Sequence, residues 1–537
     1  MQYCRAAPTR TEAPGTDPER TPPEGFSTLT EGKATILTQG NNEAFYNPAQ
    51  VVNRDLSIAV INHFQKVRAE ETMQLSGNQK RANEAQKVRT AAAKEGGLRI
   101  LEGLAATGLR SIRYAKEIDG EVERIVCNDL DPTVVESMKR NIEFNGVGDK
   151  VEASVGDARV VMLGNQRSFD VVDLDPYGAP VTLLDSAMEC VSEGGLLLCT
   201  ATDGAALCGN NSEACYAKYA SYPLHKPYCH EQAIRILLSA ISRSAARYKR
   251  FIVPVLSLSI DFYVRVFVRV YSNSATEVKN GAMKLSYVYQ SQGCDSFYLS
   301  AVGRVKVNGN SRKYLPGHCV LSSEGSTCPE TGAQFTVGGP IWNGPIHDHE
   351  WIKGVMAFMK GRGFAAEQKI RGILTSALQE LPDVPLHMDL HNMCKILKCS
   401  VPPHHVVKSA LINAGYRTSG VHCSKTALKT DAPWDFVWDV MRAWIKEHPT
   451  VKPLPEGSAG HKIANKTPGR IDVNFSRAPG AVVFKGKNTT TRFVQNPAGW
   501  GPKTMHGKKI KTDDRKRPRD EGGEKEGENG GGGGCIS

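Results

Sequence analysis

The sequence contains no uninterrupted apolar stretch approaching the roughly 20 residues that a membrane-spanning helix needs. Its beginning, MQYCRAAPTRTEAPGTDPER, also lacks the apolar core of a signal peptide. These two absences predict a soluble, intracellular protein. The 14 cysteines are scattered over 537 residues instead of being crowded into a short secreted scaffold. This distribution favours reduced thiols over paired disulfides.

Two nucleotide-binding signatures are also missing. Nothing resembles a phosphate-gripping Walker loop, and the stretch GLAATG does not follow the G-x-G-x-x-G pattern of dinucleotide-binding proteins. A dinucleotide cofactor is therefore disfavoured. The formal net charge of +11 suits a polyanionic partner such as nucleic acid. Charge alone leaves that question open, because a modest positive balance is also common in proteins that bind no polyanion.

Composition divides the chain into four parts. Residues 1–27 are rich in Pro, Thr, Glu and Arg with little to bury, which predicts a disordered lead. Residues 28–271 form a first domain, and residues 272–450, with more Gly, Ser and His and shorter patterns, form a second. Residues 451–537 are expected to be a basic, largely disordered tail.

Short apolar runs alternate with helical patterns throughout the first domain. Such runs are typical of a mainly parallel sheet with helices on both faces, so an α/β fold is predicted. The last run, DFYVRVFVRVY, alternates apolar and polar residues, which predicts a strand at the sheet edge. In the second domain, an α+β unit, helices are expected in HDHEWIKGVMAFMKG, FAAEQKIRGILTSALQEL and PPHHVVKSALINAGY.

Ligands of open α/β sheets bind outside the carboxyl ends of the strands, so the residues at those ends are candidate site residues. The first end, EGLAATGLR, carries Glu102, Gly103 and Gly108. Its small residues let a ligand approach the backbone, although a plain turn fits equally well. In the second end, CNDLDP, Asp129 is placed to accept from ribose hydroxyls, whereas Asp131, followed by proline, suits a helix cap.

The third and fourth strand ends carry groups that recognise a base. In VGDAR, Asp157 and Ala158 are placed to bind an adenine, with a solvated turn as the alternative. FDVVDLDPYGAP ends in Asp175, Pro176 and Tyr177. A carboxylate and a proline carbonyl accept the hydrogens of an exocyclic amine and draw its lone pair out of the ring, while an aromatic face stacks on the base. The alternative is that the Asp-Pro pair begins a helix.

A glycine loop, a ribose acid, an adenine acid and an Asp-Pro-aromatic end occur in this order in class I methyltransferases that use S-adenosylmethionine. The first domain resembles these enzymes. Asp173, two residues before Asp175, falls inside the predicted strand and is the weaker catalytic candidate. A base buried in a duplex or a folded RNA has to swing out to reach such a site.

Over nearly its whole length the chain resembles the Trm1 family of tRNA guanine-26 N2-dimethyltransferases. The matching segments are EGKATILT, FYNPAQVVNRDLS, ILEGLAATGLRSIRYAKEI, NDLDPTVVESMKRNIEFN, DLDPYGAP, TDGAALCG, YCHEQAIRILL, VGGPIW, AGYRTSGVHCSKTALKTDAPW and RFVQNPAGWGPK. The resemblance implies a Rossmann-like methyltransferase domain followed by a family-specific domain that helps to hold tRNA. It also implies two methyl transfers from S-adenosylmethionine to N2 of one guanine.

The strand ends and the resemblance together define a candidate site. Asp175 is the implied catalytic acceptor, assisted by Pro176, and Phe45 and Tyr177 are implied to pack around the target base. The cofactor-binding set is Arg54, Glu102, Gly103, Gly108, Arg110, Asp129, Asp157 and Ala158.

Metal binding is not expected. Members of the family often carry two Cys-x-x-Cys pairs, a spacing suited to tetrahedral zinc. Here the pairs read SQGC and CPET, so that Cys294 and Cys328 remain, and a metal-free knuckle is predicted unless His318 or Cys319 is recruited. Four further donors have a wide spacing that favours ordinary packing: Cys208, Cys215, Cys229 and His230.

The C-terminal segments suggest RNA contact and a cellular location. The stretch PPHHVVKSALINAGYRTSGVHCSKTALKTDAP predicts a winged-helix-like RNA surface, and RFVQNPAGWGPK an arm packed on the body or on RNA. KKIKTDDRKRPR, residues 508–519, resembles a nuclear-import signal, with a solvated charge run as the alternative. A nuclear location is predicted, mitochondrial and cytoplasmic pools stay open, and no protein partner is predicted.

Two other functions remain open from the sequence. One is a methyltransferase for another exocyclic amine in RNA or DNA. The other is an RNA-binding or RNA-folding protein with a vestigial pocket, which the degenerate cysteine pairs support. The intact glycine loop, Asp157 and Asp175 argue against it.

Overall fold

The computed structural model describes residues 21–39, 46–77, 96–309, 311–319, 327–449, 453–469, 472–481 and 491–496. The chain divides into two compact units, Met1–Pro497 and Ala498–Ser537, and every described residue lies in the first. Phe45, residues 1–20 of the expected lead and the basic segment 508–519 fall outside the described residues.

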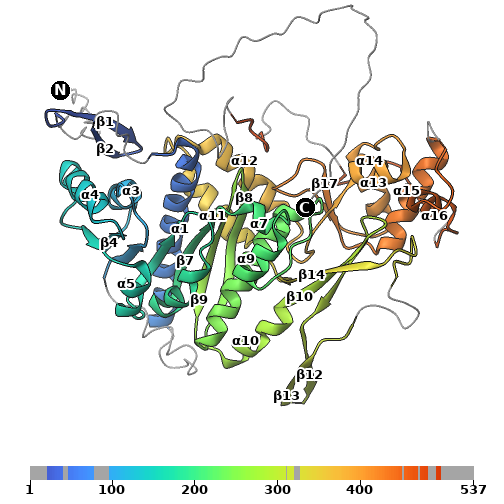
Figure 1. The fold of residues 1–537 in the computed structure, drawn as a ribbon, viewed down its shortest axis with the longest axis horizontal. Helices are drawn as coiled ribbons and strands as arrows, with labels where there is room; N and C mark the ends of the chain where they lie inside the picture. The colour runs from blue at the N-terminus through green and yellow to red at the C-terminus, as the bar shows by residue number, and fades with distance from the viewer. Residues whose placement is uncertain are drawn as a thin grey trace, which may run out of the picture. The chain divides into compact units, whose positions relative to one another are not determined.

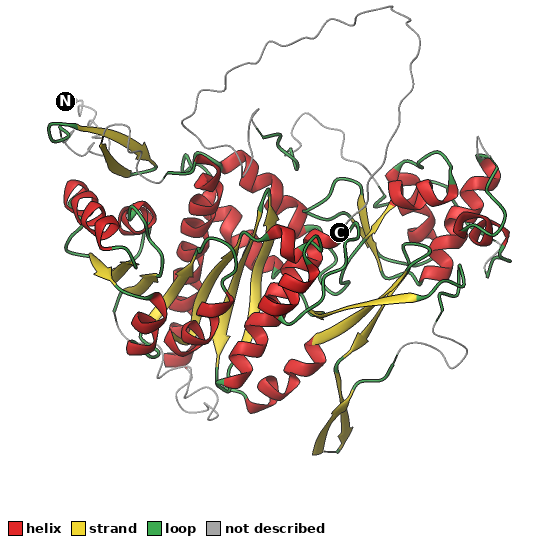
Figure 2. Cartoon of the chain, viewed as in Figure 1, coloured by secondary structure: helices red, strands yellow, loops and turns green. Residues whose placement is uncertain are grey.

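A seven-stranded sheet forms the centre of the first unit (Figures 1 and 2). Its strand order is β5-β4-β3-β6-β7-β9-β8, and β9 runs antiparallel to both of its neighbours. The chain reverses its winding direction between β3 and β6, so the carboxyl ends of these strands border the crevice where such sheets bind ligands. The strands are β3 (Leu98–Glu102), β4 (Val122–Asp129), β5 (Val151–Val155), β6 (Phe169–Leu174), β7 (Val191–Ala201), β8 (Phe251–Ile260) and β9 (Tyr263–Tyr271).

The mainly parallel sheet confirms the predicted α/β fold, but the edge-strand prediction is wrong. DFYVRVFVRVY forms β9, which lies between β7 and β8, and β8 is the edge. The polar residues that produce the alternation are buried: Arg265 pairs with Asp173, and Arg269 pairs with Glu71. Buried arginines, each paired with a distant carboxylate, therefore gave an interior strand the pattern of a half-exposed one.

Helices cover both faces of the sheet. One face packs against α1, α3, α4, α11 and α12, and the other against α5, α6 and α9 (Figure 1). Of these, α11 and α12 follow residue 271, yet Trp351, Ile352 and Leu374 share one apolar cluster with α1 and the sheet. The domain boundary at residue 271 stays a prediction. The helices are α1 (Val51–Gly77), α3 (Leu109–Glu117), α4 (Pro132–Asn145), α5 (Ala158–Gly164), α6 (Leu184–Cys190), α9 (Cys229–Arg247), α11 (His349–Met359) and α12 (Glu367–Leu378).

Local sequence sets the helix ends. The Asp131 side chain accepts from the backbone N–H of Thr133 and caps α4, which confirms the predicted cap. Gly146, in the left-handed conformation, ends the same helix. Asp348 caps α11 by accepting from two backbone N–H groups of its first turn.

Smaller elements complete the described chain. Strands β11, β10 and β14 form one sheet, β12 and β13 a two-stranded hairpin, and β15, β17 and β16 a short sheet beside α13 to α16. The three helices expected in the second domain are present as α11, α12 and α14. Helices α10, α13, α15 and α16 were not anticipated, and α16 falls within the expected tail. No described helix has the length and apolar character needed to cross a bilayer. The bounds are β1 (Phe26–Glu31), β2 (Ala34–Gln39), α7 (Gly204–Leu207), α8 (Ser212–Tyr219), α10 (Ala275–Lys279), β10 (Leu285–Ser291), β11 (Phe297–Ala301), β12 (Gly303–Asn308), β13 (Ser311–Pro316), β14 (Phe335–Trp342), β15 (Met388–Asp389), α13 (Leu390–Leu397), α14 (His404–Asn413), β16 (Thr418–Ser419), β17 (Ala427–Thr430), α15 (Trp434–Glu447) and α16 (Ala459–Asn465).

Candidate active site

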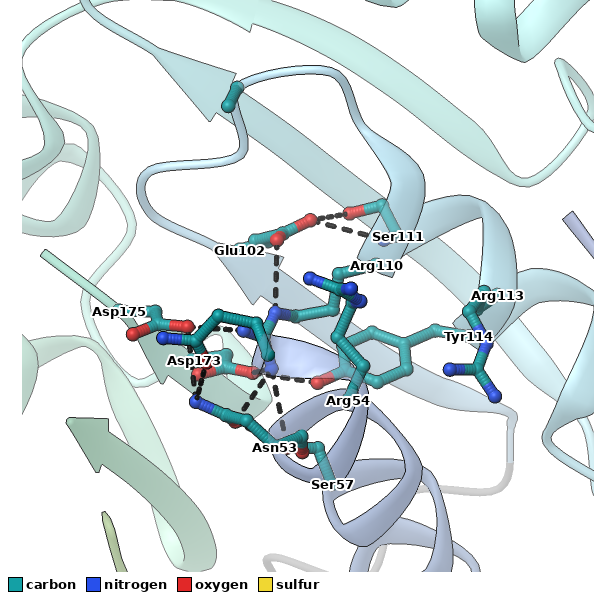
Figure 3. Close-up of polar contacts among 12 residues, drawn as sticks. Asn53, Arg54, Ser57, Glu102, Arg110, Ser111, Arg113, Tyr114, Asp173 and Asp175 are labelled. Carbon is teal, nitrogen blue, oxygen red and sulfur yellow. Dashed lines mark hydrogen bonds and ion pairs between the residues drawn. The ribbon is translucent and has the colours of Figure 1, made fainter. Parts of the chain in front are cut away.

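The guanidinium of Arg110 is the centre of a buried polar network at the carboxyl ends of β3 and β6 (Figure 3). Its Nη2 donates to Oδ2 of Asp175, and its Nη1 donates to Oδ1 of Asn53 at 3.1 Å. Only 6% of the Arg110 side chain is exposed, so carboxylates instead of water neutralise its charge. The remaining partners of Arg110 are Glu102, Asp173 and Ser57.

The Asp175 carboxylate is held at one oxygen. Oδ2 accepts from Arg110 and, at 3.3 Å, from Nδ2 of Asn53. Within the described residues, both polar contacts of this carboxylate fall on Oδ2. The side chain is 15% exposed, which leaves Oδ1 to accept from a ligand.

The loop that follows Asp175 presents an aromatic ring. Pro176 is buried, whereas residue Tyr177 is 79% exposed. Gly178 donates its N–H to Oγ1 of Thr202 at 2.6 Å and accepts from the N–H of Thr202 at 2.9 Å, which anchors the loop to the end of β7. No helix begins at residues 175–180, so the helix-start alternative is wrong.

Asp173 belongs to the framework below the loop. It is 1% exposed, and it accepts from the Tyr114 hydroxyl at 2.6 Å and from Arg265 at 2.9 Å. Burial acts to raise the pKa of Asp173, but Arg265 and Arg110 outweigh burial and lower it. A buried, fully engaged carboxylate has no room for a base, in agreement with its rank as the weaker catalytic candidate.

Glu102 fixes the first turn of α3. Its Oε2 accepts from the backbone N–H of Ser111 at 3.1 Å and from the Ser111 hydroxyl, and its Oε1 faces Nε of Arg110 at 3.3 Å. Burial raises the pKa of Glu102 to about 8, against the lowering effect of Arg110. These contacts make Glu102 a support for the loop; a direct role at the cofactor stays a prediction.

Both glycines of the loop lie against neighbouring elements, which leave little room for a side chain. A Cβ on Gly103 would lie 3.1 Å from Cδ2 of Leu174, and one on Gly108 would lie 2.9 Å from Cγ of Met138. Gly108 also has a φ of +74°, a conformation that L side chains rarely adopt. Ala106 has a φ of +47°, which concentrates backbone strain in the loop.

Asp129 holds this loop from the next strand. Its Oδ2 accepts from the N–H of Ala106 at 2.9 Å, and its Oδ1 accepts from the N–H of Asp131 at 3.2 Å. Leu130, the next residue, is 70% exposed. The sequence analysis did not name Leu130 as a candidate site residue. The pattern that could have identified it is an apolar residue between two aspartates at a strand end.

Asp157 and Ala158 lie at the start of α5. Asp157 caps that helix by accepting from the N–H of Arg159 at 2.8 Å, and it also pairs with the Arg159 side chain. These hydrogen bonds lower the pKa of Asp157 to about 2. Ala158 is buried. The carboxylate predicted to bind adenine therefore already has a cation as its partner.

Arg54 is engaged away from the Asp175 contacts. Its Nε donates to Oε1 of Glu31 at 2.6 Å, and its guanidinium lies 5.3 Å from the ring centre of Tyr46. These bonds join α1 to β1. Its neighbour Asn53 makes the contact with Asp175 instead, and sequence reasoning missed it although both belong to the matching segment FYNPAQVVNRDLS.

The two remaining cysteines of the degenerate pairs meet in the second half of the chain. Sγ of Cys294 lies 3.6 Å from Sγ of Cys328, and it also contacts the hydroxyls of Ser291 and Ser296. Among the described residues, no group of three or more His, Cys, Asp or Glu donors includes this pair. Recruitment of His318 or Cys319 thus receives no support from the described geometry.

The order of the seven strands, with reversed β9 inside the edge, and the acidic residues at the carboxyl ends define a class I methyltransferase fold. A family model described as N2,N2-dimethylguanosine tRNA methyltransferase matches residues 25–442. The chain belongs to this family, as its resemblance predicted.

Individual relatives agree with this assignment. The tRNA (guanine(26)-N(2))-dimethyltransferase 1 of Arabidopsis thaliana is 44% identical over 533 residues, which cover 90% of this chain and 89% of that protein. The tRNA (guanine(26)-N(2))-dimethyltransferase of Homo sapiens is 40% identical, over 89% of this chain and 77% of its own length. The structure of Trm1 from Pyrococcus horikoshii with S-adenosyl-L-methionine has a TM-score of 0.62 and 29% identity, covering 77% of this chain and 99% of that one.

Proposed function

We propose that this protein transfers two methyl groups from S-adenosylmethionine to N2 of guanine 26 in tRNA. Family membership supports the reaction class. Within the structure, one observation carries the proposal: the Asp175 carboxylate is held by Arg110 and Asn53 through Oδ2 alone, beside an exposed Tyr177. Such a carboxylate is positioned to accept a hydrogen bond from a base.

The residues at the ends of β3 and β4 fit S-adenosylmethionine. Asp129 has a carboxylate at the position where such sheets bind a ribose, and the exposed Leu130 offers an apolar face for an adenine. The loop from Gly103 to Gly108 is preformed by its own contacts. When bound, S-adenosylmethionine supplies an electrophilic methyl group on a sulfonium. For Asp157 to bind adenine, Arg159 has to share or release its carboxylate.

The chain's own residues make the guanine amine reactive. The lone pair of that nitrogen is delocalised into the ring, so the amine is a poor nucleophile. We assign Oδ1 of Asp175 and the carbonyl of Pro176 as acceptors for its two hydrogens, which turns the lone pair towards the methyl group. Arg110 pairs with the other oxygen of this carboxylate, and an ionised carboxylate is purely an acceptor. Tyr177 supplies the stacking face.

Each transfer would form an N–C bond as the S–CH3 bond of the sulfonium breaks, with S-adenosylhomocysteine as the leaving group, and the nitrogen would then release one proton to Asp175 or water. The amine has two hydrogens before the first transfer and one before the second. A single acceptor, Asp175, is therefore sufficient for the second step. After two transfers no N–H remains to bind Asp175, which gives a chemical reason for the reaction to stop and the base to leave.

The β12–β13 hairpin supplies a surface for the RNA backbone. Lys306 and Lys313 are exposed and lie directly opposite each other in its ladder, and like charges at such positions are destabilising. Neither lysine forms an ion pair with any residue that the structure describes. Arg304 and Arg312 add to the charge of the hairpin, which extends beyond the β10–β14 sheet (Figure 1). We assign this hairpin to phosphate contacts.

A nuclear location is also proposed, on the two basic clusters of residues 508–519. Among the relatives, the yeast protein is named as mitochondrial. The assignment is tested by fusing residues 508–519 to a fluorescent protein, which should then enter the nucleus. Replacing the seven Lys and Arg of KKIKTDDRKRPR by Ala, one cluster at a time, should abolish that import.

The reaction itself is tested by incubating the full chain with unmodified tRNA and S-adenosylmethionine and analysing the nucleosides by mass spectrometry. N2,N2-dimethylguanosine at position 26 is expected. A methylated nucleoside other than an N2-methylated guanosine would refute the assigned target. No methylation by an enzyme that binds both tRNA and cofactor would support a vestigial pocket instead.

A further inference from the structure

Three metal-ligating side chains meet outside the site described above. Cys208 follows the last residue of α7, and Cys229 and His230 are the first two residues of α9. Their donor atoms all lie within 4.8 Å of one another, and Sγ of Cys208 is 3.7 Å from Nδ1 of His230. The spacing of these residues in the sequence favoured ordinary packing, but the fold brings α7 and α9 together (Figure 1).

The arrangement has the dimensions of a tetrahedral zinc site. Bonds of about 2.3 Å to sulfur and about 2.0 Å to nitrogen place neighbouring ligand atoms roughly 3.6 Å apart. The 3.7 Å separation of Cys208 Sγ and His230 Nδ1 matches such an edge. Cys215, which the sequence grouped with these residues, is not part of the cluster.

The cluster offers two sulfur donors and one imidazole nitrogen. Thiolate and imidazole are donors that zinc prefers over Mg²⁺ or Ca²⁺, and two thiolates neutralise its charge. Cys208 and Cys229 are half-buried and His230 is exposed, so water can reach a fourth position.

We propose that Cys208, Cys229 and His230 bind one Zn²⁺ ion, with water as the fourth ligand. The ion fastens the end of α7 to the start of α9. Helix α7 begins two residues after Thr202, whose hydroxyl anchors Gly178 in the loop of Asp175. The metal therefore braces the segment that supports the catalytic loop, and its role is structural.

Metal analysis of the full chain, purified under reducing conditions from zinc-supplemented cells, tests the site. About one zinc ion per chain is expected, as for a single site. The variant Cys208→Ser with Cys229→Ser should lose the zinc. The matched control, Cys294→Ser with Cys328→Ser, removes another close thiol pair and should retain it.

A second variant covers the case in which the double serine variant fails to fold. His230 has an exposed side chain, so His230→Gln should leave the circular dichroism spectrum unchanged and lower the zinc content at a fixed chelator concentration. Co²⁺ in place of zinc should give a thiolate-to-metal charge-transfer band in the wild type that His230→Gln shifts. Three results would each overturn the proposal. They are a wild-type protein that contains no zinc, a double variant of Cys208 and Cys229 that retains zinc, and a Cys208–Cys229 disulfide in the peptide map.

Discussion

Nη2 of Arg110, in the first turn of α3, donates to Oδ2 of Asp175, at the end of β6, across 65 positions of sequence. The pair joins a residue expected at the cofactor to the residue expected at the base. The same guanidinium contacts Glu102 and Asn53. The glycine loop and the Asp-Pro-Tyr loop are therefore parts of one electrostatic network. A substitution of a charged residue in either loop should alter the position of the charged residues in the other.

Asp175→Ala is expected to lower methyl transfer by at least about 10²- to 10³-fold, the loss typical of removing one transition-state hydrogen-bonding group. Binding of tRNA should stay within a few-fold, because Asp175 acts on the base and not on phosphates. Asp175→Asn preserves the shape and should lose activity similarly. Tritium transfer from labelled S-adenosylmethionine and gel shift measure the two quantities.

The control for Asp175 is Asp185→Asn, which changes an exposed carboxylate paired with Arg247 at the surface. It should have wild-type activity. Full activity in Asp175→Asn would show that the carboxylate does not activate the amine.

Asp129 and Asp131 provide a matched pair of neighbouring carboxylates. Asp129→Ala should raise the Kd for S-adenosylmethionine by about tenfold or more, because a lost hydrogen bond to a charged group amounts to about 1.5–3 kcal/mol. Asp131→Ala should leave that Kd unchanged and lower the free energy of unfolding, because α4 loses its cap. Calorimetric titration and urea unfolding separate the two; equal Kd values would contradict the ribose assignment.

The raised pKa of Glu102 predicts a pH dependence of stability. Burial raises that pKa from 4.5 to about 8, so the folded protein keeps the proton at pH values where the unfolded chain has lost it. The contribution of Glu102 to stability therefore falls as pH rises from near 4.5 to about 8 and levels off above that range. The glutamine of Glu102→Gln does not titrate, so this variant does not lose stability by the same route. The Tm of the variant minus the Tm of the wild type should therefore increase from pH 5 to pH 8.

Differential scanning calorimetry at several pH values measures this difference. Glu152→Gln is the control, because Glu152 is exposed and pairs with Arg124 at the surface. A Tm difference for Glu102→Gln that does not change with pH would show that the carboxyl titrates normally.

The hairpin assignment predicts an effect on tRNA affinity that depends on salt. The double variant Lys306→Glu with Lys313→Glu should raise the Kd for tRNA about tenfold or more at low ionic strength. It should also reduce the slope of log Kd against log salt concentration by roughly 1.5 to 2, because two phosphate contacts are lost. The single-turnover rate at saturating tRNA should stay within about twofold, because the hairpin takes no part in the chemistry.

The control for the hairpin replaces Arg124 and Lys353 by Glu. Both are exposed cations, but each already pairs with a carboxylate, Glu152 or Glu350. A salt slope that changes equally in the control and in the hairpin variant would remove the hairpin from the RNA surface.

The sequence was sufficient to predict the location of those residues whose position depends on the local pattern of apolar runs and helices. Asp129, Asp157 and Asp175 each end or follow an apolar run, and the order of runs and helices gave the sheet. Asn53 was missed because its partner Asp175 is 122 positions away. The strand DFYVRVFVRVY was wrongly predicted to lie at the sheet edge, because Asp173, the buried partner of Arg265 in that strand, is 92 positions away. The periodicity of a sequence indicates which residues share a face of a strand or helix. It does not indicate which distant charged residue neutralises a charged residue on a buried face.

The packing of α11 and α12 on α1 has a consequence for synthesis of the chain. The ribosome completes β9 at Tyr271, but the second of these helices ends only at Leu378. At about 5–20 residues per second, that gap of roughly 100 residues leaves the apolar face of α1 without its cover for roughly 5 to 20 seconds. The part of the chain that ends at β9 therefore cannot complete its packing until α11 and α12 have been synthesised. During that interval we expect chaperones to bind its exposed apolar surface.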